Sequence, residues 1–286
     1  MKTLETLVED INCVIKGQGG WDATVTKFLA DSVAEVADSR FGSPPESRGY
    51  LSLSSLGTPC SRKLWYRVNK TDLAEPLASN TLLKFFFGDI IEALALSLAK
   101  AAGHSVVGMQ GRLNVHGIKG HRDAVIDGVT VDVKSTSSMA FKKFKEGKLR
   151  EDDPFGYISQ LSSYVYGGKD DPLVTDKRRG AFLAIDKQNG HICLDVYDFD
   201  EELKTKEEDV KSVVAMVSGP IPEYRIPPVP QSKTSKNTKL DTQCSYCEFR
   251  KACWPEARTF LYSNGPVFLV DVVDEPRVFE VKDGNS

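Results

Sequence analysis

The sequence lacks a net positive charge, an export signal and an uninterrupted apolar run of membrane length. It has 37 Lys and Arg against 40 Asp and Glu, so any surface for nucleic acid must be local. Residues 1–10 carry acidic side chains where an export signal would be apolar, and we expect a cytoplasmic protein. Charges at Lys84, Asp89 and Glu92 interrupt the stretch 81–99, which therefore predicts a buried helix and no membrane partner.

The sequence also has no internal repeat and no Walker-type phosphate loop, and this absence excludes an ATP-driven motor in this chain. What is present suits a globular protein, because 286 residues with 41% hydrophobic content can bury a full core. Helical spacing of apolar residues and short alternating runs follow one another along the chain. They predict an α/β (α+β) fold with helices over 4–15, 23–39, 80–102, 156–167 and 200–217, strands over 180–186 and 191–197, and a terminal hairpin from 267–272 and 277–281.

The six cysteines form two groups. Cys13 and Cys193 stand alone among apolar neighbours, and we interpret them as buried free thiols. The other group has three cysteines within ten residues, in the pattern C-x2-C-x5-C, and one far upstream: Cys244, Cys247, Cys253 and Cys60. A zinc site more often shows two close pairs, and the four histidines lie far from this segment, so Cys60 is the natural fourth ligand.

A hairpin is predicted over residues 120–135. Asp127-Gly128 between alternating runs indicates a two-residue turn, in which paired residues have numbers that sum to 255 and Asp123 faces Asp132. One face then carries apolar side chains only, and the other carries both aspartates and Lys134. Two carboxylates about 5 Å apart at Cβ repel each other unless a cation lies between them, so the pattern favours a divalent metal site. Lys134 can reach a phosphate oxygen or a water beside that metal.

Three motifs in order carry a resemblance to a known family: Gly120-x-x-Asp123, Asp132-Val133-Lys134 and Gln160-x-x-x-Tyr164. This order resembles the RecB-like branch of the PD-(D/E)XK nucleases. The resemblance implies a restriction-endonuclease-like core with a central mixed β-sheet flanked by helices. It implies that Asp123, Asp132 and the Val133 carbonyl hold Mg²⁺ or Mn²⁺ and that Lys134 is the catalytic lysine. Gln160 and Tyr164, four residues apart on one helix face, would serve the active site or the DNA backbone.

The family also has a Gly followed four residues later by a His or an acid on the preceding helix. Gly88 and Glu92 match this spacing, and we assign Glu92 as the third metal ligand and catalytic residue, with Asp89 as the competing candidate. A carboxylate directed toward a core or cleft is costly unless it is paired or binds metal. The iron-sulfur relatives have His here, and the Glu could change which cation is preferred.

The cysteine pattern resembles that of the CRISPR-associated exonucleases and of the AddB nuclease domain. The resemblance implies a structural [4Fe-4S] cluster on Cys60, Cys244, Cys247 and Cys253 that joins the N- and C-terminal parts of the nuclease. Zinc is the alternative. The resemblance covers residues 56–256. We expect an N-terminal helical extension over 1–55, the nuclease core over 56–230, the cysteine-cluster segment over 231–260, and a tail or hairpin over 261–286.

Basic residues near these motifs are candidate DNA contacts: Arg62, Lys63, Lys142, Lys143, Lys145 and Lys148. No base-reading motif occurs, so we expect sequence-independent binding to DNA. The resemblance implies an exonuclease acting on single-stranded DNA or duplex ends in recombination, repair or phage DNA processing, in a bacterial or phage-infected cytoplasm. A recombination or acquisition partner, or self-association, would fit such a role. A non-catalytic DNA-binding subunit and an endonuclease are the alternatives.

Overall fold

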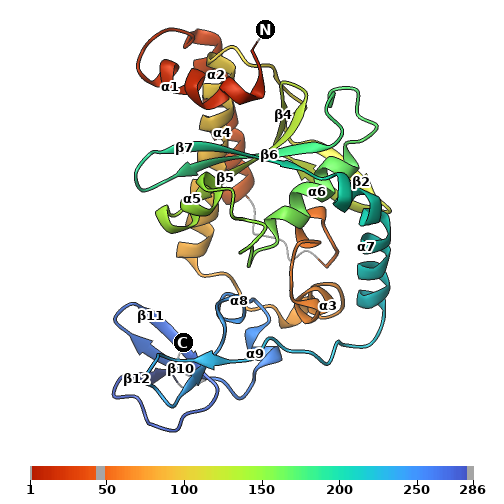
Figure 1. Cartoon of the computed structure of the whole chain (residues 1–286). Coiled ribbons are helices and arrows are strands. Elements are labelled where there is room, and N and C mark those ends of the chain that lie inside the picture. Colours follow the sequence, from red (N-terminus) through yellow and green to blue (C-terminus); the bar gives the residue numbers. More distant parts are fainter. Residues whose placement is uncertain (1, 43–48, 282–286) are drawn as a thin grey trace. The chain divides into compact units, whose positions relative to one another are not determined.

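The computed structural model describes residues 2–42 and 49–281 (Figure 1). The chain forms two compact units. The first contains the N-terminal helices, Leu51–Gly57 and Ala78–Val214, and the second contains Thr58–Leu77 and the chain from Ala215 onward. No helix in the described part of the chain is both long and apolar enough to span a membrane.

A five-stranded mixed sheet forms the centre of the first unit, in the order β1-β4-β5-β6-β7. β5 and β6 run parallel, and the other neighbours run antiparallel. The strands are β1 (Val106–Val107), β4 (Ala124–Ile126), β5 (Val129–Thr136), β6 (Arg179–Asp186) and β7 (Ile192–Asp198). β5 and β6 are buried at most positions because helices cover both faces of the sheet.

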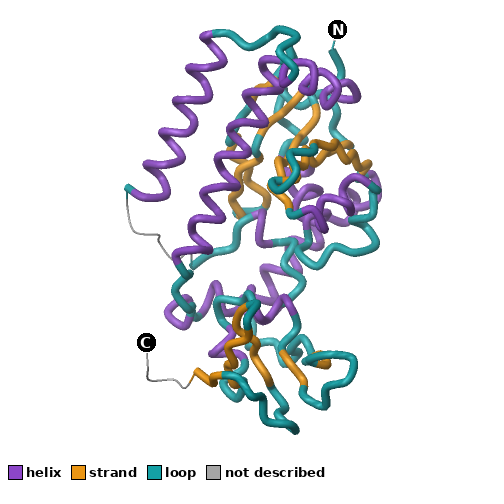
Figure 2. Tube along the Cα trace, turned by 90° about the vertical axis from the view of Figure 1, so that its left-hand side faces the viewer, coloured by secondary structure: helices purple, strands orange, loops and turns teal. Residues whose placement is uncertain are grey.

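Helices α1 (Leu7–Ile15) and α4 (Ser79–Ala101) cover one face of this sheet, and α2 (Ala23–Phe41) packs against α4. Helices α5 (Ser138–Lys145) and α6 (Tyr157–Gly167) cover the other face through a second apolar cluster that includes Phe144, Leu161 and Phe182 (Figures 1 and 2). The expected α/β fold with a central mixed sheet flanked by helices is therefore confirmed.

Helix α4 is less buried than the sequence predicts. Its C-terminal half packs into the core through Ala95, Leu96 and Ala99. Its N-terminal half exposes Phe85 and Phe87, and the prediction of a buried helix was wrong for this half. The apolar composition of the stretch does not reveal that the sheet ends before the helix does.

The predicted hairpin is divided between two sheets. β3 (Ile118–Arg122) pairs with β2 (Gly111–Val115) in a small separate sheet, and the chain passes through Asp123 before β4 joins the central sheet. A Cβ at Gly120 would lie 2.6 Å from Cβ of Leu53, in the short 3-10 helix η2 (Leu53–Ser55), so glycine is required there. The hairpin proper is β4–β5.

The turn of this hairpin is tied to two helices. Asp127 and Gly128 both have positive φ, as a turn of this length requires. The Asp127 carboxylate lies 2.6 Å from His104 Nδ1, and the opposite ring nitrogen of His104 lies 3.2 Å from Asp10 of α1. His104 follows α4 and its side chain is fully buried. One imidazole thus links α1, the end of α4 and the turn.

Helix α7 (Asp200–Ser218) leads out of the first unit. The second unit contains η3 (Thr71–Leu73), α3 (Ser61–Asn69), α8 (Thr242–Ser245), α9 (Arg250–Cys253) and a five-stranded sheet in the order β12-β10-β11-β9-β8. Its strands are β8 (Val229–Pro230), β9 (Thr238–Lys239), β10 (Arg258–Tyr262), β11 (Gly265–Leu269) and β12 (Phe279–Val281). The terminal hairpin is β10–β11, and not 267–272 with 277–281 as predicted, because β12 pairs with β10.

The expected boundaries at 55/56, 230/231 and 260/261 do not coincide with the two units. The helices expected as an N-terminal extension contribute Leu4, Leu7 and Ile11 to the main core of the first unit. The segment from Thr58 to Leu77, expected within the nuclease core, belongs instead to the cysteine-bearing second unit.

The carboxyl of Asp195 on β7 should make the stability of this fold depend on pH. Burial raises the pKa of its carboxyl to about 6, although the Tyr197 hydroxyl donates to it at 2.6 Å. The folded state therefore holds this proton more tightly than the unfolded chain, and stability should fall as the pH rises from about 4 to about 6. We expect Asp195→Asn to have the same melting temperature as wild type near pH 4, and a melting temperature a few degrees higher than wild type at pH 7.

Thermal melts across this pH range measure the effect, with Asp170→Asn, which changes an exposed carboxylate, as the control. A difference between Asp195→Asn and wild type that is the same at pH 4 and pH 7 would contradict the burial of Asp195.

Candidate active site

The β4–β5 hairpin has the register expected from the sequence. Ala124 pairs with Val131 and Ile126 with Val129, so partner numbers sum to 255. Asp123 directly precedes β4, where the same register sets it opposite Asp132. Its Oδ2 atom accepts a hydrogen bond from the Val133 amide at 2.7 Å.

The two faces of the hairpin differ as expected. Ala124, Val131 and Val133 point into the core beneath α4. Asp132 is on the opposite face and is only 2% exposed, which is unusual for an aspartate. A carboxylate this deeply buried requires a compensating positive charge.

Glu92 of α4 is the third carboxylate of this group. Its Oε1 atom accepts a hydrogen bond from Gln110 Nε2 at 2.6 Å. Asp89, the competing candidate one turn earlier, forms an ion pair with Arg40 of α2 at 2.5 Å. Asp89 therefore already has a cationic partner, and Glu92 is held by a neutral amide.

Burial and mutual repulsion act together on these acids. Burial, together with the charge of Asp132, raises the pKa of Glu92 to about 7 despite the Gln110 hydrogen bond. Burial also raises the pKa of Asp123 well above its ordinary value, and the charges of Asp132 and then Glu92 add to the increase. The three carboxylates thus lie within electrostatic reach of one another, with Asp132 buried and Glu92 and Asp123 partly buried.

Lys134 supplies one positive charge to this group. Its Nζ atom lies 2.6 Å from Asp132 Oδ2 and 4.7 Å from the centre of the Tyr157 ring. Burial acts to lower the pKa of Lys134, but the charges of Asp132 and Asp123 outweigh it and the pKa is raised. Lys134 is therefore a charged ammonium at neutral pH.

Gln160 and Tyr164 of α6 form a chain of hydrogen bonds that begins at Lys134. Lys134 Nζ donates to Gln160 Oε1 at 3.3 Å, and Gln160 Nε2 donates to the Tyr164 hydroxyl at 2.8 Å. Burial raises the pKa of Tyr164 to about 12, so it stays protonated. Helix α6 begins after Gly156, whose positive φ and close approach to the Gly57 backbone leave no room for a side chain.

The carboxylates suit a divalent cation in number and chemistry, yet each one already has a protein partner. Asp123 accepts from the Val133 amide, Glu92 accepts from Gln110, and Asp132 is paired with Lys134. Asp132 Oδ2 nevertheless accepts no hydrogen bond of good geometry. As the side chains of residues 2–42 and 49–281 stand, no three His, Cys, Asp or Glu converge on a single-ion site. The carboxylates would therefore have to move closer together to bind one ion.

The second unit brings the four predicted cluster cysteines together. Cys60 precedes α3, Cys244 is in α8 and Cys253 ends α9. Burial, together with the charges of Cys60, Cys247 and Cys253, raises the pKa of Cys244 to about 12, so the four thiols lie within electrostatic reach. Cys13 and Cys193 lie elsewhere and are half-buried, less buried than we expected.

The candidate DNA contacts have different surroundings. Arg62 donates to the Pro222 carbonyl at 2.7 Å and Lys63 forms an ion pair with Glu248 at 3.0 Å, so both are engaged inside the second unit. Lys143 and Lys148, in and just after α5, form ion pairs with Asp152 and Glu146. Lys142 and Lys145 of α5 are exposed to solvent.

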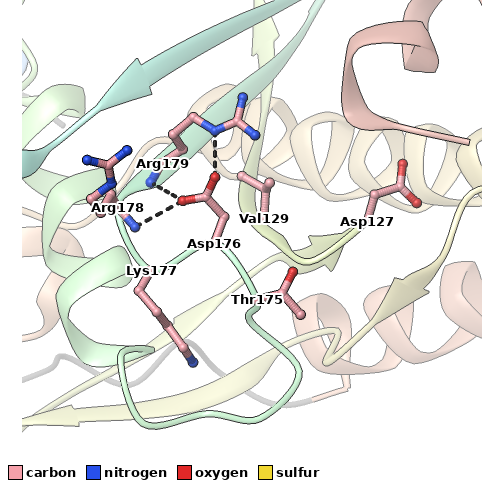
Figure 3. Close-up of a pocket in the computed structure, with 7 residues that line it drawn as sticks. All are labelled: Asp127, Val129, Thr175, Asp176, Lys177, Arg178 and Arg179. Atoms are coloured by element: carbon pink, nitrogen blue, oxygen red, sulfur yellow. Dashed lines mark hydrogen bonds and ion pairs between the residues drawn. The ribbon is translucent and has the colours of Figure 1, made fainter.

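A pocket at the turn end of the hairpin is separate from the carboxylates (Figure 3). It is lined by Asp127, Val129 and residues 175–179. Asp176 accepts hydrogen bonds from the backbone amides of Arg178 and Arg179 and from Arg179 Nε, as Figure 3 shows. The Asp176 carboxylate and the Arg179 guanidinium thus pair with each other, and we assign the pocket no ligand.

No family model matches this sequence, and no curated protein is similar to it at the level of sequence. Among solved structures the chain is similar to an alkaline exonuclease, LHK-Exo, from Laribacter hongkongensis, at 17% identity and a TM-score of 0.43 over 60% of this chain and 89% of that one. It is also similar to SSO0001, at 16% identity and a TM-score of 0.40 over 79% of this chain and 94% of that one. At these values the likeness concerns the course of the chain alone.

Sequence reasoning missed two residues of the site. Gln110 lies in the turn before β2, and Tyr157 opens α6 beside Lys134. Neither belongs to a motif with a fixed spacing from the acids. A glutamine at positive φ leaves no recognisable pattern in the sequence, because glycine and asparagine are the residues that normally signal such a turn.

Mutual repulsion predicts that a carboxylate of this group destabilises the metal-free protein. Asp123→Asn keeps an oxygen that can accept from the Val133 amide and removes a buried charge. We expect it to raise the melting temperature by a few degrees in EDTA at pH 8. Mn²⁺ should stabilise wild type more than the variant, because a ligand stabilises the state that binds it.

Melting curves with EDTA and with Mn²⁺ provide the measurement, and Asp170→Asn is the matched surface control. A lower melting temperature for Asp123→Asn in EDTA would show that the carboxylate stabilises the fold, contrary to this account.

Proposed function

We propose that this protein is a metal-dependent DNA nuclease whose active site is formed by Glu92, Asp123, Asp132 and Lys134. The observation that supports it is the gathering of three carboxylates around one lysine, of which Asp132 is buried and Glu92 and Asp123 are partly buried. Such an arrangement is unfavourable by itself, and a divalent cation would relieve it.

Glu92, Asp123, Asp132 and the Val133 carbonyl would hold Mg²⁺ or Mn²⁺. When bound, the ion would act as a Lewis acid on a phosphate oxygen and lower the pKa of a water molecule. The chain's own groups have separate tasks. Lys134 is kept charged by Asp132 and can bind a phosphate oxygen or orient the attacking water. Gln160 and Tyr164 hold Lys134 from the side of α6.

The proposed substrate is DNA, bound without regard to sequence. Lys142 and Lys145 on α5 present cations to solvent just after the strand that carries Asp132 and Lys134. Lysines are suited to phosphates, which are common to every sequence. The order of the motifs in the sequence supports a further part of the proposal, which is exonuclease action on single strands or duplex ends in recombination, repair or phage DNA processing.

Removal of one acid or of the lysine should abolish digestion. We expect Asp132→Asn and Lys134→Met each to lower the rate by at least about 100-fold, because transition-state charge then lacks its stabilising group. The assay follows end-labelled linear single-stranded and duplex DNA with Mg²⁺ or Mn²⁺, and Asp170→Asn is the control.

A circular single strand distinguishes the two modes of cutting, because an exonuclease leaves it intact and an endonuclease linearises it. Digestion by Asp132→Asn at the wild-type rate would overturn the proposed active site.

For the second unit we propose a [4Fe-4S] cluster bound by Cys60, Cys244, Cys247 and Cys253. The mutual effect of the four thiols on the pKa of Cys244 supports a shared site. Four thiols that surround a polynuclear cluster stand farther apart than four that share one ion. The four thiols of this unit interact electrostatically but do not converge on one point, which is compatible with a cluster. Burial raises the pKa of Cys253 and Cys247, and the nearby charges of Arg62 and Lys63 respectively oppose this increase.

Anaerobically purified protein should be brown, with absorption at about 400 nm and about four iron atoms per chain. We expect Cys247→Ser to lose most of this absorption and to melt at a lower temperature, because binding to the folded state alone contributes to stability. Cys13→Ser, which changes a cysteine of the first unit, should keep both. A colourless protein with one zinc atom per chain would replace the cluster with the zinc alternative.

A further inference from the structure

The three carboxylates share one feature, which is that each is held by a single partner from the protein. The backbone amide of Val133 holds Asp123, and the ammonium of Lys134 holds Asp132; both partners belong to β5, the strand that also carries Asp132. Glu92 comes from a different layer, on α4, and its side chain has three rotatable bonds. Its partner is Gln110, at 2.6 Å, in the turn between β1 and β2.

Gln110 connects two of the proposed metal ligands. Its side-chain amide donates to the Glu92 carboxylate, and its backbone amide donates to the Asp123 carbonyl at 3.0 Å. The helix that carries Glu92 and the chain segment that carries Asp123 are therefore fixed to each other through one residue. This turn is also closed on itself, since the Gly111 amide donates to the Gly108 carbonyl at 3.1 Å.

The backbone of Gln110 adopts a conformation that its residue type disfavours. Its φ is +49°, in the left-handed region, which costs a non-glycine residue about 1 kcal/mol or more. Gln110 is exposed, so packing does not require its side chain. Glycine or asparagine would fit this turn at lower cost, but neither has a side chain long enough to make the contact with Glu92. The strained backbone conformation thus occurs at a residue whose long side chain carries an amide with a specific partner, Glu92.

We propose that Gln110 is a positioning residue for the metal site, which holds Glu92 through one carboxylate oxygen and leaves the other free to bind the cation. This inference rests on the proposed function. A neutral amide suits the task, because it restrains the carboxylate and does not cancel the negative charge that would attract the metal. Outer-shell partners of this kind typically contribute 10–100-fold to metal affinity.

The deciding variant is Gln110→Asn. Asparagine tolerates the left-handed backbone and keeps an amide, but is one methylene too short to maintain the 2.6 Å contact. We expect the fold to melt at the wild-type temperature or above it, and Mn²⁺ to bind about tenfold more weakly. Mn²⁺ binding is measured without DNA, by calorimetry and by electron paramagnetic resonance, so the readout does not depend on digestion.

The matched control is His116→Asn. His116 also has a φ of +49°, in the turn between β2 and β3, and its ring lies 3.6 Å from Glu207, which is not one of the proposed metal ligands. It should bind Mn²⁺ as wild type does. Gln110→Gly, which removes the amide entirely, should match Gln110→Asn. In a Glu92→Ala background, the further change Gln110→Asn should have no effect on Mn²⁺ affinity, because the side chain through which the contact acts is already absent.

The outcomes separate the inference from the proposed function. If wild type binds Mn²⁺ and Gln110→Asn binds it equally well, Gln110 is not a positioning residue and the metal site stands. The same conclusion follows if Gln110→Asn weakens binding as much in the Glu92→Ala background as in wild type. If wild type binds no Mn²⁺, the metal site itself fails, and the role of Gln110 fails with it.

Discussion

The enforced proximity of Glu92, Asp123 and Asp132 is the constraint on which the candidate active site of the first unit depends. A two-residue turn sets Asp123 opposite Asp132, and α4 brings Glu92 to the same side of the sheet. The opposite side of the hairpin is apolar and packed beneath α1 and α4, so the strands cannot rotate to separate the acids without exposing that core. Folding therefore forces these charges together, and hydrophobic burial supplies the free energy that does so.

The parts of this site that the sequence revealed follow from short-range rules. Side chains alternate along a strand, and an Asp-Gly pair fixes the length of the turn, so the facing of Asp123 and Asp132 could be derived from four residues. Gln160 and Tyr164 lie one helical turn apart, and their shared face was predictable in the same way. The contact of Gln160 with Lys134 was not predictable, because it depends on how α6 packs on the sheet.

Other features depend on contacts between distant segments, and the sequence did not reveal them. The chain changes sheets at Asp123, which requires the small β2–β3 sheet to rest on Leu53. Gln110 meets Glu92 only after α4 and the β1–β2 turn have packed together. The C-terminal sheet was mispredicted because β12 pairs with β10 across an intervening loop, and pairing over such a distance leaves no local signal.

The second unit is discontinuous in sequence, and this has a consequence for the order of events during protein synthesis. Cys60 emerges from the ribosome 184 residues ahead of Cys244, since 244 − 60 = 184. At roughly 5–20 residues per second, the first thiol waits about 10–40 s for its companions. All the strands of the central sheet, and with them the proposed catalytic residues, have been made within that interval. A nascent chain can thus complete its chemical centre while the cysteine site is still missing three of its four members.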